Sequence, residues 1–590
     1  MSPERKIRNV NVLRAEAIFD RRDDGTLYVR SPRPLGSYPG KLTERLEYWA
    51  VQAGGRTFLA QRDPSGGWRT ITYAETLNRV RSIAQSLLDR NLDATTPVAI
   101  LSGNSIEHAL MALGCMYAGV LYAPLAPAYS LASSELTTLR YLWQSLNPAL
   151  VFAAEGTVFE KPLSGFLDSR TEFVAVSKPE ILRATPFAEV AAASPGAGVD
   201  EAHAKVRPDT IAKVLFTSGS TGTPKGVITT QRMLCSNQEM LRTVMAFLTD
   251  EPPVLCDWLP WNHVFGGSHN FGIALYNGGT LYIDEGKPTP AGLSTTLKNL
   301  REIATTAYFN VPRGYEMILP ALREDAGFRR HFFSRLKILF YAAAGLNQRV
   351  WDELQDLAVE ACGEEILMMT GLGATESSPF ALSTGLEGAA AGRVGLPVPG
   401  VELKIVPVET KFEARLRGPN ITPGFWRNPG LTAASFDDEG FYKLGDALLF
   451  ADPDRPLEGF CFDGRLAEDF KLSTGTWVSV GPLRTRLLTF LLGVAHEVVI
   501  AGPDRDFVTA LIFPHPGASK DKLHELLVAF AKQSTGTSTR VQRALVLERP
   551  PSMDQGELTE KGSINQKAVL RNRAALVEEL YSGSPRVIEI

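Results

Sequence analysis

The sequence predicts an α/β fold, with a large N-terminal domain of helix-covered β-sheets plus a β-barrel-like subdomain, and a small α+β C-terminal domain. Short apolar, β-rich runs alternate with longer helical patterns between about residues 70 and 460. A turn-rich stretch occupies residues 401–450, and strand and helix patterns resume after it. The chain has 590 residues, which is too long for one ordinary core and indicates at least two domains.

The alternating region supplies most of the expected elements. Strands are expected where a short run is apolar and β-prone, over 98–101, 211–216, 254–259, 280–283, 307–311 and 336–341. Helices are expected over the longer patterns at 105–118, 229–248 and 348–362. The most apolar stretch, 109–126, contains Gly114, Gly119 and Pro124, so we expect a buried helix and strand there and not a membrane span.

Turn signals separate this region from the C-terminal part of the chain. They fall at 418–419, 422–424 and 428–430, and short β segments are expected between them. Farther on we expect strands at 498–500 and 509–513 and a helix at 520–532. We therefore divide the chain into an N-terminal domain over 1–464 and a C-terminal domain over 465–590.

Composition and charge exclude several classes of protein. The net charge is −4 without a basic patch, which argues against nucleic acid or a membrane as a stable partner. The five cysteines are scattered and form no CxxC pair, so neither a disulfide framework nor a zinc site is expected; they are Cys115, Cys235, Cys256, Cys362 and Cys461. The polar N-terminus has no secretory signal, and we expect a cytoplasmic protein.

The most informative motif is the loop that follows the expected strand 211–216. It reads Thr-Ser-Gly-Ser-Thr-Gly-Thr-Pro-Lys over residues 217–225. Such a loop can present backbone N–H groups, hydroxyls and one ammonium to a single anion, and glycine permits the close approach. A polyphosphate is the natural ligand, which indicates a nucleotide-using enzyme. The position of Lys225 does not fit a Walker A motif, which ends in Gly-Lys-Ser/Thr.

Four further segments carry candidate functional side chains. They are His263 among aromatic residues and glycines, Glu376 at the end of a glycine-rich stretch, and Asp446 and Arg465, each after a glycine. In this order, and together with the loop at 217–225, they resemble the adenylate-forming superfamily. That superfamily includes acyl-CoA synthetases, luciferases and the adenylation domains of peptide synthetases. The resemblance covers about residues 40–575.

Within the superfamily, four stretches are similar to the bacterial feruloyl-CoA synthetases, which are hydroxycinnamate:CoA ligases. These stretches are 102–108, 257–267, 276–280 and 561–566. The resemblance implies a reaction in two steps. A carboxylic acid is first joined to AMP with release of pyrophosphate, and the acyl group then passes to the thiol of coenzyme A. It also implies ATP, Mg²⁺ and coenzyme A as cofactors.

The resemblance implies a role for each residue around ATP. Glu376 and Thr217 would ligate Mg²⁺, and Thr375 would contact the α-phosphate. Asp446 would accept hydrogen bonds from both ribose hydroxyls, and Arg465 would add a ribose or phosphate contact. The β- and γ-phosphates would be held by Thr217, Ser218, Gly219, Ser220, Thr221, Gly222, Thr223 and Lys225. The remaining nucleotide contacts would come from Ala344, Gly345, Gly371, Gly373 and Ala374.

A lysine of the C-terminal domain completes the catalytic set that the resemblance implies. In the superfamily this small domain is mobile and rotates between the two steps, which brings a lysine to the carboxylate and the α-phosphate. Here Lys561 is predicted as that lysine, and Lys567 is its rival. The other predicted catalytic residues are Thr375, Glu376 and His263.

The hinge and the coenzyme A site depart from the usual pattern of the superfamily. The hinge position, usually Asp or Lys, is Ala467 here. The rotation is therefore expected to pivot at Glu468 or Asp469, or to need no polar residue. Lys471 and Gly475 lie in the next segment, which resembles long-chain acyl-CoA synthetases and carboxylate reductases, and they are predicted to contact coenzyme A.

The acyl pocket is expected between the His263 segment, the strand leading to 342–345, and the turn 371–373. Small residues at 342–345 leave room for a flat ring. The lining is predicted to be mostly apolar and to comprise His263, Val264, Phe265, Gly267, Phe309, Ala342, Ala343 and Leu372. The segment 262–274 has no acidic residue, which argues against an amino acid as the substrate.

We therefore expect an ATP-dependent hydroxycinnamate:CoA ligase for ferulate, p-coumarate or caffeate. Alternatives are a CoA ligase for another aryl or medium-chain acid, a freestanding enzyme that loads a carrier protein, a luciferase-like oxidase, and a degenerate nucleotide-binding module. No carrier-protein segment follows the adenylating region, which favours free coenzyme A as the acceptor. Whether the chain forms a homodimer is left open.

Overall fold

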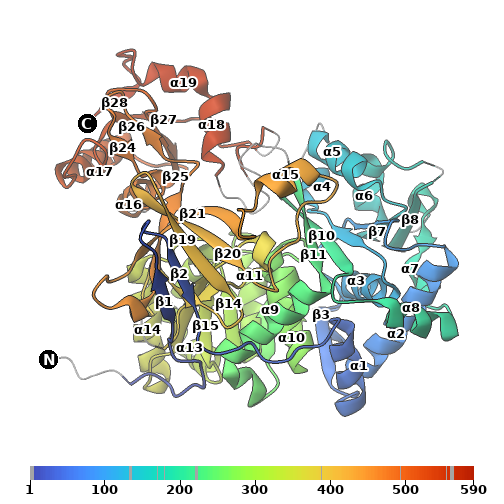
Figure 1. Ribbon diagram of the computed structural model, residues 1–590. Coiled ribbons are helices and arrows are strands. Elements are labelled where there is room, and N and C mark those ends of the chain that lie inside the picture. The colour runs from blue at the N-terminus through green and yellow to red at the C-terminus, as the bar shows by residue number, and fades with distance from the viewer. Residues whose placement is uncertain are drawn as a thin grey trace.

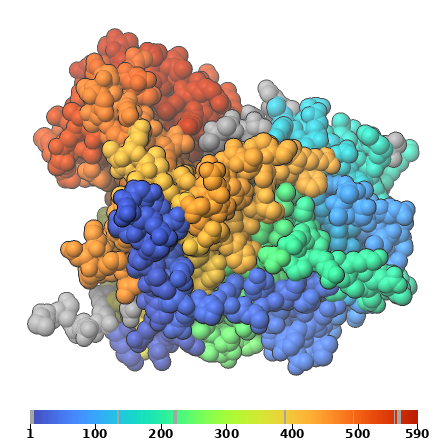
Figure 2. All heavy atoms as spheres, viewed as in Figure 1, coloured from blue at the N-terminus to red at the C-terminus, as the bar shows by residue number. Residues whose placement is uncertain are grey.

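The computed structural model describes residues 6–131, 136–168, 170–178, 180–218, 224–386, 389–491, 493–552, 555–558 and 564–590 (Figure 1). Helices cover three sheets of eleven, seven and four strands in the N-terminal part of the chain, and a separate four-stranded sheet lies near the C-terminus. Figure 2 shows the C-terminal part, in red, standing out from the main body. The predicted α/β fold with a large N-terminal and a small C-terminal domain is confirmed.

The first sheet has seven strands in the order β11-β10-β6-β5-β7-β8-β9. These are β5 (Val98–Ile100), β6 (Tyr122–Pro124), β7 (Leu150–Glu155), β8 (Glu172–Ser177), β9 (Thr185–Pro186), β10 (Ile211–Ser218) and β11 (Pro224–Thr230). Its helices are α2 (Tyr73–Asp89), α3 (Ile106–Ala118), α4 (Ala128–Leu131), α5 (Thr137–Leu146), α6 (Gly156–Leu163), α7 (Phe187–Val190) and α8 (Ala197–Lys205). The apolar stretch 109–126 forms α3 and β6, as predicted. Among the described helices, none is long and apolar enough to cross a membrane.

The second sheet has four strands in the order β12-β13-β3-β4. These are β3 (Thr57–Arg62), β4 (Trp68–Thr72), β12 (Val254–Asp257) and β13 (Thr280–Ile283). The helices of this region are α1 (Thr43–Gln52), α9 (Gln231–Val244), α10 (Phe271–Asn277) and α11 (Leu293–Glu302). A π-helix, η3 (Phe265–Asn270), leads directly into α10. This short π-helix contains part of the predicted acyl pocket.

The third sheet has eleven strands in the order β1-β2-β19-β20-β21-β22-β18-β17-β16-β15-β14. Its parallel strands are β14 (Ala307–Asn310), β15 (Ile338–Tyr341) and β16 (Leu367–Leu372), beside α12 (Pro312–Glu324), α13 (Ala326–Phe333) and α14 (Gln348–Cys362). The antiparallel strands are β1 (Ile18–Arg21), β2 (Leu27–Arg30), β17 (Leu382–Ser383), β18 (Arg393–Pro397), β19 (Glu402–Val408), β20 (Lys411–Arg417), β21 (Tyr442–Phe450) and β22 (Phe460–Arg465). Because β18 also contacts β2, this antiparallel part curls towards a barrel.

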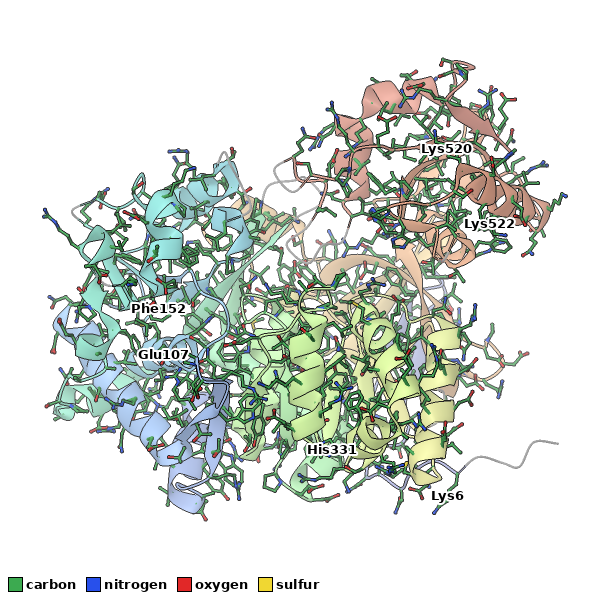
Figure 3. The ribbon with its side chains drawn as sticks, turned by 180° about the vertical axis from the view of Figure 1, so that it is seen from behind. Lys6, Glu107, Phe152, His331, Lys520 and Lys522 are labelled. Atoms are coloured by element: carbon green, nitrogen blue, oxygen red, sulfur yellow. The ribbon has the colours of Figure 1, made fainter. Side chains whose placement is uncertain are left out.

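The C-terminal part has its own core. Its strands are β23 (Phe470–Lys471), β24 (Trp477–Val478), β25 (Ala495–Ala501), β26 (Val508–Pro514), β27 (Val541–Val546) and β28 (Val587–Glu589). Its helices are α16 (Val480–Phe490), α17 (Lys520–Lys532), α18 (Gln566–Asn572) and α19 (Ala574–Glu579). Two clusters of buried apolar side chains hold it together, and every described member lies after residue 469. Figure 3 shows Lys520 and Lys522 on this domain, well apart from Phe152 in β7. The boundary at residue 464 stays a prediction.

Several expected elements begin or end a few residues away from the predicted bounds, and for two of them the local cause is clear. The helix expected from residue 229 begins at Gln231 and ends at Val244, because 224–230 pair with β10 as strand β11 and the Thr230 hydroxyl caps the helix by accepting from the Met233 amide at 3.3 Å. The strand expected over 254–259 ends at Asp257, whose carboxylate accepts a hydrogen bond from the Leu259 amide. This bond turns the chain away from the sheet.

Candidate active site

The predicted phosphate loop connects two antiparallel strands. β10 and β11 are antiparallel, and Thr217 lies opposite Lys225 in their register. The predictions for Gly219, Ser220, Thr221, Gly222 and Thr223 fall outside the described residues. A hairpin, and not the strand-to-helix connection of a Walker A loop, therefore presents the Lys225 side chain.

The β11 strand brings the hairpin to the turn that carries Glu376. It contacts the 3-10 turn η4 (Thr375–Ser377), and the segment 424–426 pairs with its other side. The Trp426 amide donates to the Gly226 carbonyl at 2.7 Å, and the Lys225 ammonium lies 5.6 Å from the centre of the Phe425 ring. The structure thus brings Lys225 and Glu376 to neighbouring elements, as the predicted site requires.

The Glu376 turn is held by side chains from distant parts of the chain. Asn237 on α9 and Asn420 both donate from Nδ2 to the carbonyls of Ser377 and Phe380, at 2.7 to 3.4 Å. The Thr422 amide donates to the Glu376 carbonyl at 2.8 Å. Sequence reasoning missed Asn237, because a single asparagine within a helix gives no signal. These bonds fix the backbone of the turn.

Gly373 is required by the closeness of two backbones at this turn. A Cβ atom at this position would lie 1.3 Å from the Pro379 carbonyl oxygen. Gly371 meets a similar limit, since its Cβ would lie 2.3 Å from the Leu382 carbonyl oxygen. Both predicted nucleotide-binding glycines therefore allow the loop after β16 to fold back on itself.

Asp446 and Arg465 face each other across β21 and β22. The Arg465 Nε atom lies 3.6 Å from Asp446 Oδ1, and the guanidinium is largely exposed. Burial raises the pKa of Asp446 to about 6, against the opposing effect of Arg465 and with smaller contributions from Glu376 and Glu468. The Tyr442 hydroxyl bonds to Glu376 and lies on the same strand as Asp446. Two of the predicted ATP carboxylates thus lie near each other.

The remaining predicted nucleotide contacts lie at one edge of the third sheet. β15 and β16 are parallel neighbours, so their carboxyl ends meet at this edge. Ala344 and Gly345 follow β15 and are exposed, and Ala374 follows β16. Ala343, between them and the strand, has a left-handed φ of 73°. The structure therefore brings these residues together, while their contact with a nucleotide stays a prediction.

The residues present fit a hydrated Mg²⁺ bound to a polyphosphate. Among the described residues, no cluster of three or more His, Cys, Asp or Glu side chains could hold a metal alone. Mg²⁺ usually binds one or two carboxylates, keeps several waters and takes its other ligands from phosphates. The half-buried Glu376 carboxylate, with Thr217 on the adjacent hairpin, is a donor set of that kind.

The predicted acyl pocket contains a cage of aromatic rings. Phe265 on η3, Phe309 on β14 and Phe340 on β15 surround the His269 ring, with centroid distances of 5.3, 5.2 and 5.4 Å. Phe380 completes this aromatic cage at 6.0 Å. Phe265 and Phe309 were predicted from sequence, whereas His269, Phe340 and Phe380 were missed. His269 lies six residues after His263, and that is the signal that could have found it.

The chain segment before the cage is anchored to the loop between β5 and α3. Asn104 donates to the Leu259 carbonyl and accepts from the Trp261 amide, both at 2.9 Å. His263 follows this anchor and accepts from the Phe265 amide through Nδ1. Val264 is buried, and a Cβ on Gly267 would lie 2.1 Å from the Trp261 carbonyl oxygen. Ala342 and Leu372 lie at the ends of β15 and β16 and pack against the same core.

A carboxylate lies close to the cage although residues 262–274 contain none. Asp257, at the end of β12, is buried beside the Asn270 amide. Burial raises its pKa to about 7, and the Asn270 side chain opposes that shift. Asp257 is thus an acidic residue near the predicted pocket that lies outside the segment 262–274.

The predicted C-terminal contacts lie on two different elements. Lys561 falls outside the described residues, and Lys567 is exposed on α18. Lys471 and Gly475 lie in the β23–β24 hairpin, where the Lys471 ammonium is 3.3 Å from a Glu409 carboxylate oxygen. Their contact with coenzyme A stays a prediction.

The expected hinge contains a buried ion pair. The Asp469 side chain is buried, with Oδ2 2.6 Å from the Lys411 ammonium of β20. Its other oxygen accepts from the Val480 amide, where α16 begins. Asp469 thus links the barrel-like strands to the first helix of the C-terminal domain. Ala467 is exposed two residues earlier.

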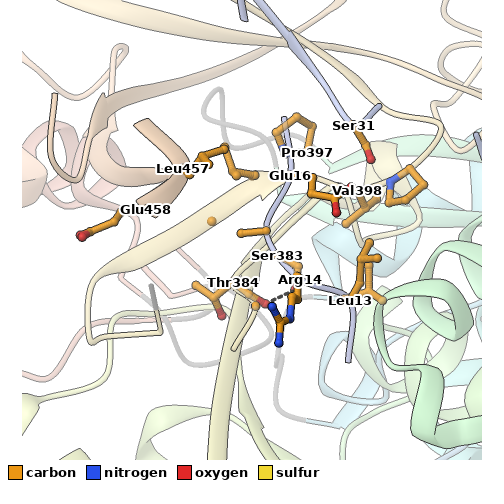
Figure 4. Close-up of a pocket in the computed structure, with 16 residues that line it drawn as sticks. Leu13, Arg14, Glu16, Ser31, Ser383, Thr384, Pro397, Val398, Leu457 and Glu458 are labelled. Atoms are coloured by element: carbon orange, nitrogen blue, oxygen red, sulfur yellow. Dashed lines mark hydrogen bonds between the residues drawn. The ribbon is translucent and has the colours of Figure 1, made fainter. Parts of the chain in front are cut away.

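A hollow in the surface lies away from all of these residues. Figure 4 shows it between the N-terminal segment at Leu13–Glu16, strands β17 and β18, and Leu457 and Glu458. None of the residues that line it is a predicted site residue. It is therefore not the predicted acyl pocket.

Comparison with known protein families decides between the classes that this geometry allows. The model of the AMP-binding enzyme family matches residues 46–426, and that of the AMP-binding enzyme C-terminal domain matches residues 471–585. The chain belongs to the AMP-binding enzyme family. It is an AMP-forming acid:CoA ligase of this family, whose usual substrates and cofactors are ATP, Mg²⁺ and coenzyme A.

Individual AMP-binding enzymes are similar to this chain at low identity. A 3-[(3aS,4S,7aS)-7a-methyl-1,5-dioxo-octahydro-1H-inden-4-yl]propanoyl:CoA ligase from Rhodococcus jostii is 24% identical, over 82% of this chain and 91% of its own length. A 3-hydroxybenzoate–CoA ligase from Aromatoleum is 25% identical, over 78% and 84%. The crystal structure of the anthranilate CoA ligase AuaEII with anthranoyl-AMP superposes with a TM-score of 0.72 at 20% identity, covering 93% of this chain and 99% of that one.

Proposed function

We propose that this AMP-binding enzyme is a hydroxycinnamate:CoA ligase that acts on ferulate, p-coumarate or caffeate. The observation that carries the proposal is the aromatic cage, which joins the predicted acyl pocket to the predicted ATP residues. Phe380 follows Glu376 by four residues, and Phe340 lies on the strand that leads to 342–345. An aromatic, apolar lining favours an acid that carries an aromatic ring.

In the first step, a carboxylate oxygen of the acid would attack the α-phosphorus of ATP. The bond between the α-phosphorus and the oxygen that bridges it to the β-phosphorus breaks, and pyrophosphate leaves with the negative charge. Lys225 would hold the departing phosphates, Thr375 the α-phosphate, and Asp446 and Arg465 the ribose. Bound Mg²⁺, held by Glu376 and Thr217, would neutralise phosphate charge. The side chains position the reactants and stabilise charge, which suits phosphoryl chemistry.

In the second step, the thiolate of coenzyme A would attack the acyl carbon of the adenylate. The carbon–oxygen bond breaks, and AMP leaves as the thioester forms. Lys471 and Gly475 are proposed to contact coenzyme A. A closed arrangement of the two domains would protect the adenylate from water.

The proposal is tested by measuring pyrophosphate release from the full chain with ATP and Mg²⁺ across a panel of acids, with and without coenzyme A. Release is expected with the three hydroxycinnamates, and thioester formation only when coenzyme A is present. Glu376→Gln should abolish release. If no aryl acid supports release, the proposal is wrong.

A CoA ligase for another ring-bearing acid is the second candidate. The 3-hydroxybenzoate–CoA ligase and the anthranilate CoA ligase among the similar proteins support it, because both names specify a single-ring acid. Benzoates with a hydroxyl or amino group therefore belong in the same panel. A preference for a benzoate over every cinnamate would favour this candidate.

A further inference from the structure

The structure assigns to His269 the recognition of a hydroxyl group on the substrate ring. We infer that its Nε2 atom accepts a hydrogen bond from a phenolic O–H at the end of the acid far from the carboxylate. This inference rests on the proposed function and deepens it, because it names the chemical group that distinguishes one aryl acid from another.

His269 carries a buried polar atom that the described residues leave without a hydrogen-bond partner. The His269 side chain is 1% exposed, and four aromatic rings surround it. Its Nδ1 atom lies 2.8 Å from Asn270 Oδ1, whereas Nε2 has no hydrogen-bond partner among the described residues. Buried polar groups are nearly always paired, so an unpaired one within a candidate pocket points to a ligand.

The neighbours of His269 decide which kind of hydrogen bond Nε2 can make. Among the residues that the structure describes, Asn270 Nδ2 and Asp257 Oδ2 are both buried without another partner, and these two side chains lie beside each other. Because the Asn270 amide directs its NH₂ group to the Asp257 carboxylate, its oxygen faces His269. The His269 Nδ1 atom must therefore carry a hydrogen and donate it to that oxygen. Burial lowers the pKa of His269 to about 4, so the ring is neutral and Nε2 carries a lone pair. The ligand must therefore supply a donor.

The backbone around His269 is held by two further buried side chains. The Lys213 ammonium of β10 donates to the Gly267 carbonyl at 2.9 Å, and Gln238 of α9 donates to the Ser268 carbonyl at 2.8 Å. Both bonds fall within the π-helix η3, and such helices often occur at functional sites. Histidine is also a less favourable filler than phenylalanine for a cage of four phenylalanine rings, because one of its nitrogens stays unpaired.

The test compares two acids that differ by one hydroxyl, 4-hydroxycinnamate and cinnamate. Pyrophosphate release is measured with ATP, Mg²⁺ and coenzyme A, and kcat/KM is obtained for each acid. We expect the unmodified chain to prefer 4-hydroxycinnamate by about tenfold or more. It should not prefer 4-methoxycinnamate over cinnamate, since a methoxy oxygen has no hydrogen to donate.

Three variants separate recognition from folding. His269→Phe keeps a ring but removes the acceptor, so it should lower kcat/KM for 4-hydroxycinnamate by about tenfold or more and leave cinnamate within about threefold. His269→Gln keeps a polar acceptor and should restore part of the preference. The control is His203→Phe, which removes another buried histidine. The His203 ring lies on α8, beside the first sheet, and stacks on the Tyr117 ring. This control should change kcat/KM for both acids by the same factor.

The outcomes distinguish this inference from the proposed function. The inference is overturned, and the proposed function stands, if the unmodified chain releases pyrophosphate with cinnamates but does not discriminate between them. The same holds if His269→Phe lowers kcat/KM equally for both acids. If no cinnamate supports release, the proposed function itself fails. A preference that is present in the unmodified chain and lost in His269→Phe supports both.

Discussion

Asp446 is the predicted ATP residue whose charge depends most directly on pH. Its carboxyl is buried between β21 and β22 and has a pKa of about 6, so it is ionised above that pH and neutral below it. The ionised form is acceptor-only and offers both oxygens to the two ribose hydroxyls, whereas the protonated form has one oxygen that acts as a donor. The state of one side chain thus links nucleotide binding to acidity.

We predict that the KM for ATP rises as the pH falls through about 6, because protonation removes an acceptor. The measurement is the rate of pyrophosphate release at varied ATP, from pH about 5 to about 8. Asp446→Asn should bind ATP weakly at every pH and lose this dependence. A KM for ATP that is the same at both ends of the range would contradict the role.

The same carboxyl should also affect folding stability, but here the low-pH, protonated form is the favourable one. Because its folded-state pKa is raised, its contribution to stability is present at low pH and is lost as the pH rises through about 6. Asp446→Asn cannot ionise, so at pH about 8 and without nucleotide it should raise the free energy of unfolding by on the order of 1–3 kcal/mol. Urea unfolding measures this. Equal stabilities of the two chains at that pH would argue against a buried carboxylate.

Gly373 gives a residue-scale prediction about the Glu376 turn. Gly373→Ala would place a Cβ 1.3 Å from the Pro379 carbonyl oxygen, so the turn must move. Pyrophosphate release should fall by about 100-fold or more, since displacements near 1 Å have effects of this size. Gly430→Ala is the matched control, because its Cβ would meet nothing within 4 Å. Similar losses in both variants would rule out this geometric explanation.

At the scale of elements, β10 and η3 are coupled through Lys213. This side chain is 1% exposed, and burial lowers its pKa to about 7. It lies on the strand that leads to the predicted phosphate hairpin, and it bonds to the π-helix that carries the aromatic cage. One side chain therefore joins the acid side of the site to the phosphate side.

Lys213→Met should leave the Gly267 carbonyl without its donor. The loss of a buried hydrogen bond costs about 1–3 kcal/mol, so the melting temperature should fall. Because η3 would be less well held, the KM for the acid should rise more than the KM for ATP. Lys205→Met, on the exposed surface of α8, is the control and should change neither. Equal rises in the two KM values would contradict the coupling to η3.

Sequence patterns predicted elements well where local signals are complete. Residues 348–362 and 520–532 are helices with the expected bounds, because their apolar spacing and flanking residues agree. The hairpin at 217–225 was not expected, since the pairing of β11 depends on β10 and on the segment 424–426. Sequence motifs also predict Glu376, Asp446 and Arg465 as site residues, and the fold brings them to neighbouring elements. His269, Phe340 and Phe380 come from separate segments, and only folding brings them together.

At the scale of the whole molecule, the predicted rotation of the C-terminal domain requires one lysine in the first step only. We predict that Lys561→Ala abolishes adenylation but retains thioester formation from supplied acyl-AMP. Lys567→Ala, on the exposed face of α18, should retain both steps. The two half-reactions are assayed separately. If adenylation survives in Lys561→Ala and is lost in Lys567→Ala, the assignment is reversed.

The ion pair between Lys411 and Asp469 has a consequence for the predicted rotation of the C-terminal domain. A swing that separates these charges would leave each in a poorly hydrated place, so intermediate positions are costly and the motion becomes a switch between discrete states. Dissolved salt screens such a buried pair only weakly, and raising the ionic strength would not loosen it. Heat would not loosen it either, because the cost of taking charges out of water falls as temperature rises, so the pair should hold the two domains as firmly in a warm cell as in a cold one.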